Sequence, residues 1–224
     1  MTPRAVLLDS FGTLVAMDPP GPHLRAELAR RGLEVEPVVA DAAFRAEIAY
    51  YLEHHIEGRD RESLDDLRDR CARVMSEVLG DPPVDVRGAM LASLRFAPFP
   101  DAIPALRALR ARGLRAVVAS NWDCSLGDVL REARLRGLVD GVVTSAEVGA
   151  AKPDRRLFDA ALELAGCDPA DAVYVGDSPE NDIAGAAAVG MRAILLERHG
   201  PQGGPEPLAR ITSLAQLPSV LFDG

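Results

Sequence analysis

Short apolar runs alternate with helical patterns along most of the chain, and this alternation constrains the fold more than any other feature of the sequence. The apolar runs lie within 5–10, 114–120, 140–145, 171–177 and 191–197. Helical patterns separate the later runs and end at Gly113, Gly166 and Gly190, a residue type that often terminates helices. Strands that alternate with helices form parallel sheets through right-handed crossovers. We therefore predict an α/β fold built on a doubly wound, Rossmann-like parallel sheet.

The interval 16–95 breaks this alternation. It carries several helical patterns and no β-like run, and it lies between the first and second predicted strands. We expect residues 1–15 and 96–224 to form the α/β core and residues 16–95 to form an inserted, all-helical cap. Because the insertion follows a strand, the cap should lie above the carboxyl ends of the strands, where ligands bind such sheets and where a cap can exclude water.

The charge balance and the cysteines limit the classes of function. The 224 residues include 25 basic and 34 acidic side chains and carry a net charge of -9, whereas nucleic acids and anionic membranes favour clustered cations. The three cysteines form no CxxC pattern, so neither a disulfide framework nor a zinc site is indicated. No apolar stretch approaches the roughly 20 residues of a membrane span. We expect a cytoplasmic monomer or homodimer that acts on a small molecule and binds neither nucleic acid nor membrane.

Polar residues follow the predicted strands, and parallel strands bring their carboxyl ends to one edge of the sheet. These residues are Asp9, Ser120, Asn121, Lys152, Asp177 and Asp182. Taken singly, each is compatible with a helix cap or a turn. Together, the three carboxylates would repel one another unless a cation lay between them, and hard oxygen ligands suit Mg²⁺. The sequence thus predicts a magnesium site at this edge.

Asp9 and Lys152 indicate covalent chemistry at the same edge. A carboxylate backed by a cation and a lysine can act as a nucleophile. Lys152 is the only lysine among the 25 basic residues, and its ammonium is a compact point charge on a flexible stem, unlike the planar guanidinium of arginine. Gly12 would let the backbone approach a bound anion, while Thr13 and Ser120 would supply hydroxyl groups.

Four segments resemble the motifs of the haloacid dehalogenase-like (HAD) hydrolase superfamily. They are "DSFGTL" (9–14), "VVASN" (117–121), "AKPDRRLF" (151–158) and "GDSPENDIAGAAAVGM" (176–191), of which the last is the most specific. The helical insertion is similar to the C1 cap of that family. The resemblance covers almost the whole chain and implies a hydrolase with a Rossmann-like core.

The resemblance also implies a set of metal ligands. Asp9 would be both the nucleophile and a ligand to Mg²⁺, and the backbone carbonyl of Phe11 would be a second ligand. Asp177 would bind the metal, and Asp182 would ligate it or orient its neighbours.

Other matched residues would act on the substrate. Ser120 would hydrogen-bond the transferring group, and Lys152 would balance the charge of the nucleophile and the phosphate. We place five further residues in contact with substrate: Phe11, Gly12, Thr13, Asn121 and Trp122.

Phe11 is where the chain departs from the phosphatases of this family, which usually carry a second Asp at this position. That Asp protonates the leaving alcohol and later activates water, and losing a general acid–base typically costs a factor of about 10²–10⁴ in rate. A phosphatase interpretation therefore requires a slow enzyme, an activated leaving group, or a proton donor from the cap, for which His54 and His55 are candidates.

Two other interpretations stay open. The 2-haloacid dehalogenases also carry an aromatic residue at this position, because halide leaves without protonation, but their fourth motif looks like SSNxxD rather than Gly176-Asp177-Ser178. A catalytically weakened protein that binds a phosphorylated ligand would tolerate the loss of the acid, yet it would not require both Asp9 and Lys152. We expect a Mg²⁺-dependent, phosphatase-type hydrolase that acts on a small phosphorylated molecule through an aspartyl intermediate.

Overall fold

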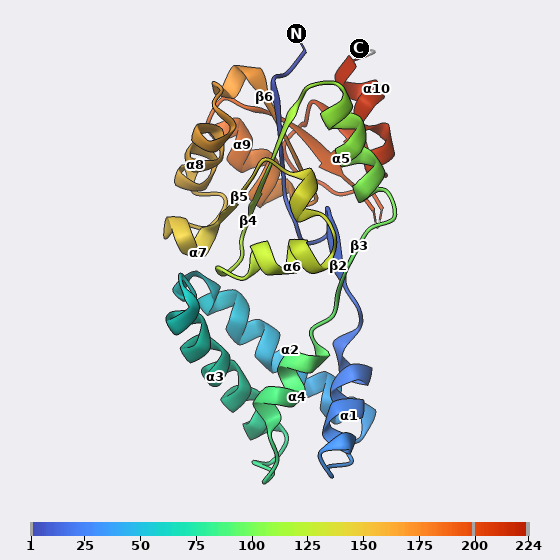
Figure 1. Ribbon diagram of the computed structural model, residues 1–224, viewed down its shortest axis with the longest axis vertical. Coiled ribbons are helices and arrows are strands. Elements are labelled where there is room, and N and C mark those ends of the chain that lie inside the picture. The colour runs from blue at the N-terminus through green and yellow to red at the C-terminus, as the bar shows by residue number, and fades with distance from the viewer. Residues whose placement is uncertain (1, 199, 223–224) are drawn as a thin grey trace.

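A six-stranded parallel sheet forms the centre of the α/β core, at the top of the view in Figure 1. The computed structural model describes residues 2–198 and 200–222. Neighbouring strands follow the order β5-β4-β1-β6-β7-β8, and every pair is parallel. The strands span Ala5–Leu8 (β1), Arg115–Ser120 (β4), Gly141–Thr144 (β5), Ala172–Gly176 (β6), Arg192–Leu196 (β7) and Ala209–Ile211 (β8). This order confirms the predicted doubly wound α/β fold.

Helices cover both faces of the sheet, so the central strand β1 is buried on both sides. Val6 and Leu8 face one core, Leu7 faces the other, and none of the three is exposed to solvent. This burial explains why the run at 5–8 is continuously apolar. One face is covered by α5 (Ala102–Ala111), α6 (Leu126–Glu132) and α10 (Leu217–Phe222), and the other by α8 (Arg155–Ala165) and α9 (Gly185–Ala188) (Figure 1).

Short helical turns complete the core. They are η2 (Arg136–Leu138), α7 (Ser145–Val148), η3 (Pro169–Asp171), η4 (Pro179–Ala184) and η5 (Leu214–Gln216). The sequence suggested one regular helix ending at Gly190, but its first part, η4, is a wider π-helical turn, and only α9 is α-helical. The predicted glycine terminators are confirmed, since Gly113, Gly166 and Gly190 have φ angles of 75°, 64° and 80°.

Four helices form the cap, which lies beneath the carboxyl ends of the strands in Figure 1. They are α1 (Pro20–Arg30), α2 (Pro37–His54), α3 (Arg61–Val78) and α4 (Val86–Ser93), with the turn η1 (His55–Glu57) between α2 and α3. The cap has an apolar core of its own around Leu24, Phe44, Leu67, Met75 and Met90. The segment between β2 and β3 is thus helical and has a core of its own, and its role as a cap over the sheet edge stays a prediction. Among the described residues, no helix combines the length and apolar character needed to span a membrane.

A short antiparallel ribbon carries the chain between the core and the cap. Strand β2 (Val15–Met17) leaves the core and pairs with β3 (Phe96–Pro98), on which the chain returns. The expectation that 16–95 lacks β-structure was wrong at its first residues, because β2 extends to Met17. Each ribbon strand has only three residues, which is too short for a β pattern to be recognised in the sequence.

Candidate active site

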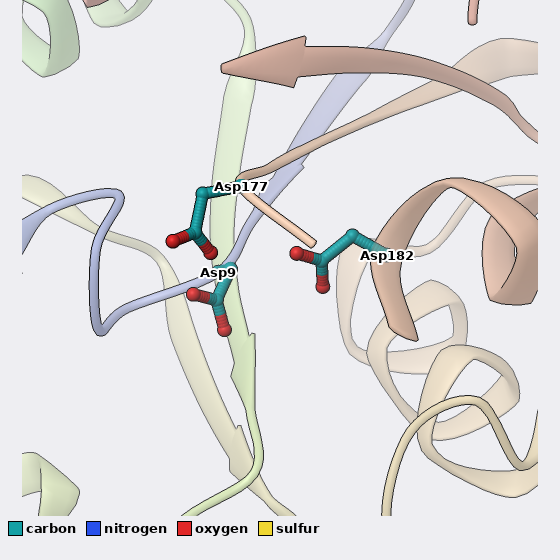
Figure 2. A group of neighbouring side chains, drawn as sticks. All are labelled: Asp9, Asp177 and Asp182. Carbon is teal, nitrogen blue, oxygen red and sulfur yellow. The ribbon is translucent and has the colours of Figure 1, made fainter. Parts of the chain in front are cut away.

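Three carboxylates from separate segments face one another at the carboxyl edge of the sheet. Asp9 directly follows β1, Asp177 directly follows β6, and Asp182 lies in η4. One oxygen from each carboxylate lies within 4.8 Å of the others. Figure 2 shows the three side chains turned toward a common centre. The register that pairs Leu8 with Val175 explains why Asp9 and Asp177 emerge next to each other.

Two glycines allow these acids to pack against the backbone. Gly12 has a φ angle of 80°, a conformation that favours glycine, and a Cβ at this position would collide with the carboxylate of Asp177. A Cβ on Gly176 would collide in the same way with the carboxylate of Asp182. Gly12 of the first motif and Gly176 of the fourth are therefore required by the close approach of the carboxylates.

The ammonium of Lys152 lies within this acidic cluster. Its Nζ donates hydrogen bonds to Oδ1 of Asp9 (2.6 Å), Oδ1 of Asp182 (2.7 Å) and the hydroxyl of Tyr174 (3.0 Å). The side chain is almost completely buried. An ammonium has three N–H donors, so its hydrogen-bonding capacity is filled by protein groups and its position is fixed.

Burial and mutual charge set the protonation of these groups. Burial disfavours the charged form of Lys152, but the carboxylates of Asp182 and Asp9 outweigh it and hold the lysine pKa well above its usual range. Burial raises the pKa of Asp9; Lys152 opposes this shift and Asp182 adds to it. Burial, and then the charges of Asp9 and Asp182, raise the pKa of Asp177 to about 7. The single positive charge of Lys152 is thus too small to neutralise the three carboxylates.

The end of β4 supports both the predicted nucleophile and the lysine. Ser120 donates a hydrogen bond from Oγ to Oδ1 of Asp9 (2.9 Å). The side-chain amide of Asn121 accepts from the backbone N–H of Lys152 (2.7 Å) and donates to its carbonyl (3.2 Å). Both polar atoms of Asn121 therefore hold the loop that carries Lys152.

The loop after β1 carries the aromatic ring of Phe11 two residues beyond Asp9. Phe11 is 48% exposed, and its ring packs against that of Trp122, with centroids 6.3 Å apart. Trp122 is itself buried and also contacts Phe96 of the ribbon. The hydroxyl of Thr13 is buried and has no hydrogen-bond partner among the described residues. Phe11 is thus the member of the predicted substrate-contacting set that lies most open to solvent.

Sequence reasoning missed Tyr174, which contacts the lysine. This residue lies in the middle of β6 and is fully buried. Its hydroxyl accepts from Lys152 and donates to the carbonyl of Ala119 (2.7 Å). A tyrosine within a completely buried strand needs a partner for its hydroxyl, and this was the signal available in the sequence.

The tip of the cap contacts the loop that follows β4. Tyr51 donates to the carboxylate of Asp123 (2.8 Å), and the N–H of Cys124 donates to the carbonyl of Gly58 (2.9 Å). The histidines suggested as cap proton donors bond to their own segment, because Nδ1 of His54 and of His55 contacts backbone carbonyls of Tyr50 and Leu52. The cap is therefore joined to the loop that begins at Asn121, directly after Ser120 at the end of β4.

The comparison with protein families agrees with this arrangement. A family model described as haloacid dehalogenase-like hydrolase matches residues 3–190. The chain belongs to this family of hydrolases. Its matched range includes the three acids, the lysine and the whole cap.

Curated relatives of this HAD-like hydrolase match over part of their length. A haloacid dehalogenase-like hydrolase domain-containing protein 3 from Bos taurus is 46% identical over 103 residues, which is 46% of this chain and 39% of that protein. A phosphoserine phosphatase from Thermus thermophilus is 34% identical over 151 residues, covering 62% of this chain and 59% of the relative. The chain therefore matches less than two thirds of the length of each of these two relatives.

Solved structures match over nearly the whole chain. A HAD phosphatase from Thermococcus onnurineus has a TM-score of 0.69 and 28% identity, with 98% of each chain covered. A 2-haloacid dehalogenase from Pseudomonas syringae has a TM-score of 0.68 and 25% identity, with 97% of each chain covered. The fold is therefore shared by structures named for both chemistries.

Proposed function

We propose that this HAD-like hydrolase is a Mg²⁺-dependent phosphatase that acts on a small phosphorylated molecule through an aspartyl intermediate. The observation that carries the proposal is the convergence of Asp9, Asp177 and Asp182, with one oxygen of each within 4.8 Å of the others. An all-oxygen donor set suits Mg²⁺, which binds through a few carboxylates and keeps positions for water and phosphate oxygens. The phosphatase names of curated and structural relatives support the same choice.

The donor set fits the proposed metal on electrostatic grounds. Lys152 supplies one positive charge to three carboxylates, and burial together with the charges of Asp9 and Asp182 raises the pKa of Asp177 to about 7. A bound divalent cation would neutralise this excess and polarise a phosphoryl oxygen. Asp9, Asp177 and Asp182 would hold it together with the carbonyl of Phe11.

Asp9 would carry out the covalent chemistry. One carboxylate oxygen attacks phosphorus, the bond from phosphorus to the leaving oxygen breaks, and that oxygen departs with the electron pair. Water then attacks the phosphorus of the aspartyl phosphate, the bond to Asp9 breaks with its electron pair left on the carboxylate, and both protons of the water leave with the released phosphate. Ser120 orients the attacking carboxylate through its 2.9 Å hydrogen bond, and Lys152 offsets the negative charge that gathers at the site.

Phe11 determines which leaving groups are favourable. Its ring carries no transferable proton, so an alkoxide would depart without help from this position. Leaving groups that are stable as anions, such as a carboxylate or a phenolate, need no such help. We expect acyl and aryl phosphates to be cleaved about 10²–10⁴ times faster than alkyl phosphates, which is the rate factor that a general acid typically contributes.

A 2-haloacid dehalogenase activity is the second candidate, and Phe11 is the observation that favours it. Halide leaves without a proton, so an aromatic residue at this position is no handicap there. The three converging acids argue against this candidate, because displacement of halide by Asp9 needs no metal. The requirement for Mg²⁺ therefore separates the two functions.

The test is a parallel assay of 4-nitrophenyl phosphate, acetyl phosphate and 2-chloropropionate, with and without Mg²⁺. We expect Mg²⁺-dependent phosphate release that Asp9→Asn abolishes. Phe11→Asp should raise turnover of an alkyl phosphate, whereas the control Phe11→Leu, which removes the ring without adding an acid, should not. Chloride release without metal would assign the dehalogenase function. A stable aspartyl phosphate without turnover would assign a binding role instead.

A further inference from the structure

Arg198 lies outside the acidic cluster but contacts the loop that carries the proposed nucleophile. It follows β7, and only 10% of its side chain is exposed. Its Nε donates to the carbonyl of Gly12 (3.2 Å), and its Nη2 donates to the carbonyl of Thr13 (2.8 Å). One guanidinium therefore holds two consecutive carbonyls that come directly after Phe11.

The same guanidinium holds the strand on which the chain returns from the cap. Asp101, three residues beyond β3, accepts bonds from Nη1 (3.0 Å) and Nη2 (2.9 Å) of Arg198 in a bidentate pair. The guanidinium also lies over the ring of Phe99, 3.8 Å from its centroid. The N–H of Phe99 in turn donates to the carbonyl of Leu14 (3.0 Å). The side chain of Arg198 thus links the segment that leads from the core to the cap with the segment that leads back.

Asp101 is itself fixed, so the link is rigid on this side. Its carboxylate also accepts from the hydroxyl of Ser213 (2.7 Å) and the N–H of Leu214 (2.9 Å), in the η5 region. Buried ion pairs contribute little net stability, because desolvation offsets the attraction between the charges. The guanidinium of Arg198 nevertheless donates to four fixed acceptor atoms, and these contacts determine how the loop and Asp101 lie relative to each other. Arginine donates in a planar arrangement that lysine cannot reproduce.

The geometry of the loop gives this contact a consequence at the acidic cluster. Gly12 packs so closely on Asp177 that a Cβ would collide with the carboxylate. A rotation of the peptides at Gly12 and Thr13 would therefore move Phe11 and its carbonyl relative to Asp177. Groups that orient metal ligands typically change metal affinity by about 10–100-fold when removed.

We propose that Arg198 is a positioning residue that holds loop 10–14 in its metal-binding geometry and couples this loop to the returning strand of the cap ribbon. The inference rests on the proposed function, because it concerns Mg²⁺ bound by the same acids. It adds a residue that contacts neither the substrate nor the acidic cluster.

Trp122 provides a readout that is independent of catalysis. It is the only tryptophan in the chain, and its ring contacts both Phe11 of the loop and Phe96 of the ribbon. A shift of either element should change the emission of this residue. Arg210 offers the matched control, since it pairs with Glu197 (2.8 Å) near Arg198 but, among its described hydrogen bonds and ion pairs, has none with the loop or Asp101.

The experiment compares Arg198→Met, Arg198→Lys and Arg210→Met by Trp122 emission, by calorimetric Mg²⁺ titration and by thermal unfolding. We expect Arg198→Met to change the emission and to weaken Mg²⁺ binding about tenfold or more. Arg198→Lys should not restore either property, because an ammonium cannot hold two carbonyls and a bidentate carboxylate. Arg210→Met should leave emission and Mg²⁺ affinity as in the wild type, even if it lowers the unfolding temperature.

Unchanged emission and affinity in Arg198→Met, or equal changes in Arg210→Met, would overturn the proposal. If Arg198→Met does not fold, Asp101→Asn replaces it, because loss of the bidentate pair frees the guanidinium that holds the two carbonyls. The emission should then change and Mg²⁺ binding should weaken, and no change in either would overturn the proposal. A wild type that does not bind Mg²⁺ would refute the proposed function. In that case an emission change confined to the Arg198 variants would still support the positioning role.

Discussion

Oδ1 of Asp9 lies 2.6 Å from Nζ of Lys152, and the two side chains are only 7% and 3% exposed. The same ammonium also pairs with Asp182 at 2.7 Å. Because the side chains of Asp9 and Lys152 are buried, each charge is stable only when it is paired with an opposite charge, since burial penalises an uncompensated ion. The pair therefore connects the stability of the fold with the chemistry proposed for it.

Replacing Lys152 by Met should lower both the stability of the fold and the phosphatase turnover. Two buried carboxylates would lose their counter-charge, and breaking a buried pair in this way typically costs about 3–5 kcal/mol. Phosphatase turnover should fall by about 10²-fold or more, the cost of losing one charge-stabilising donor. Urea unfolding and a kinetic assay measure the two effects. Asp9→Asn is the companion variant: it should abolish turnover without this loss of stability, since Lys152 keeps Asp182. Equal destabilisation by both variants would contradict the argument.

Asp177→Asn should stabilise the protein when Mg²⁺ is absent. The pKa of Asp177 is raised to about 7 by burial and by Asp9 and Asp182, so its charged form is unfavourable near neutral pH. Removing the charge relieves this repulsion, but it also removes a proposed ligand. Thermal unfolding at pH 8 should show a higher midpoint for the variant without metal and a smaller rise on adding Mg²⁺. The control Asp168→Asn, at an exposed position, should alter neither quantity.

The shared edge of the acids was predictable because parallel strands bring their carboxyl ends to one edge of the sheet. Once 5–8 and 172–176 are parallel neighbours, Asp9 and Asp177 must leave the same edge of the sheet. A special role for Lys152 was indicated by its being the only lysine in a chain rich in arginine, and its place at this edge by its position after the predicted strand at 140–145. These conclusions depended on local patterns and on one topological rule.

Other contacts could not be predicted, because they depend on packing over long sequence distances. Arg198 is one of many arginines, and nothing in its local sequence indicates the carbonyls of Gly12 and Thr13 as its partners. Asn121 was assigned to the substrate, yet its amide bonds to the backbone of Lys152. An amide at a strand end can face the substrate or a neighbouring loop, and sequence alone does not decide between them.

Tyr174→Phe tests whether the third partner of Lys152 matters. The variant removes the acceptor 3.0 Å from Nζ and the donor to the carbonyl of Ala119, so two buried groups each lose one hydrogen bond. We expect kcat to fall about tenfold with a smaller change in KM, because Lys152 would lose its fixed position. Phe158→Leu is the control, since it disturbs the ring contact with Tyr174 but no hydrogen bond. A kcat effect in the control as large as in Tyr174→Phe would assign the result to packing.

Glu47 gives the cap a pH-dependent stability. This residue of α2 is buried in the cap, where desolvation raises its pKa to about 7, although a hydrogen bond from Cys71 opposes the shift. The unfolded chain ionises Glu47 near pH 4.5, whereas the folded protein keeps the proton until about pH 7. The free energy of unfolding should therefore fall as pH rises through this window and carry the full penalty above it.

Glu47→Gln should remove that penalty. The amide matches the protonated acid in shape and charge, so we expect equal stability at pH 4 and a gain of about 2–3 kcal/mol over the wild type at pH 8, measured by urea unfolding. Glu27 provides a contrast within the same cap, because hydrogen bonds from Arg31 and Arg30 lower its pKa. Its stabilising contribution is present above the unfolded pKa and is lost in acid. Glu27→Gln should therefore destabilise the protein at pH 8, and a stabilising effect there would show that the two carboxyls do not differ as their partners indicate.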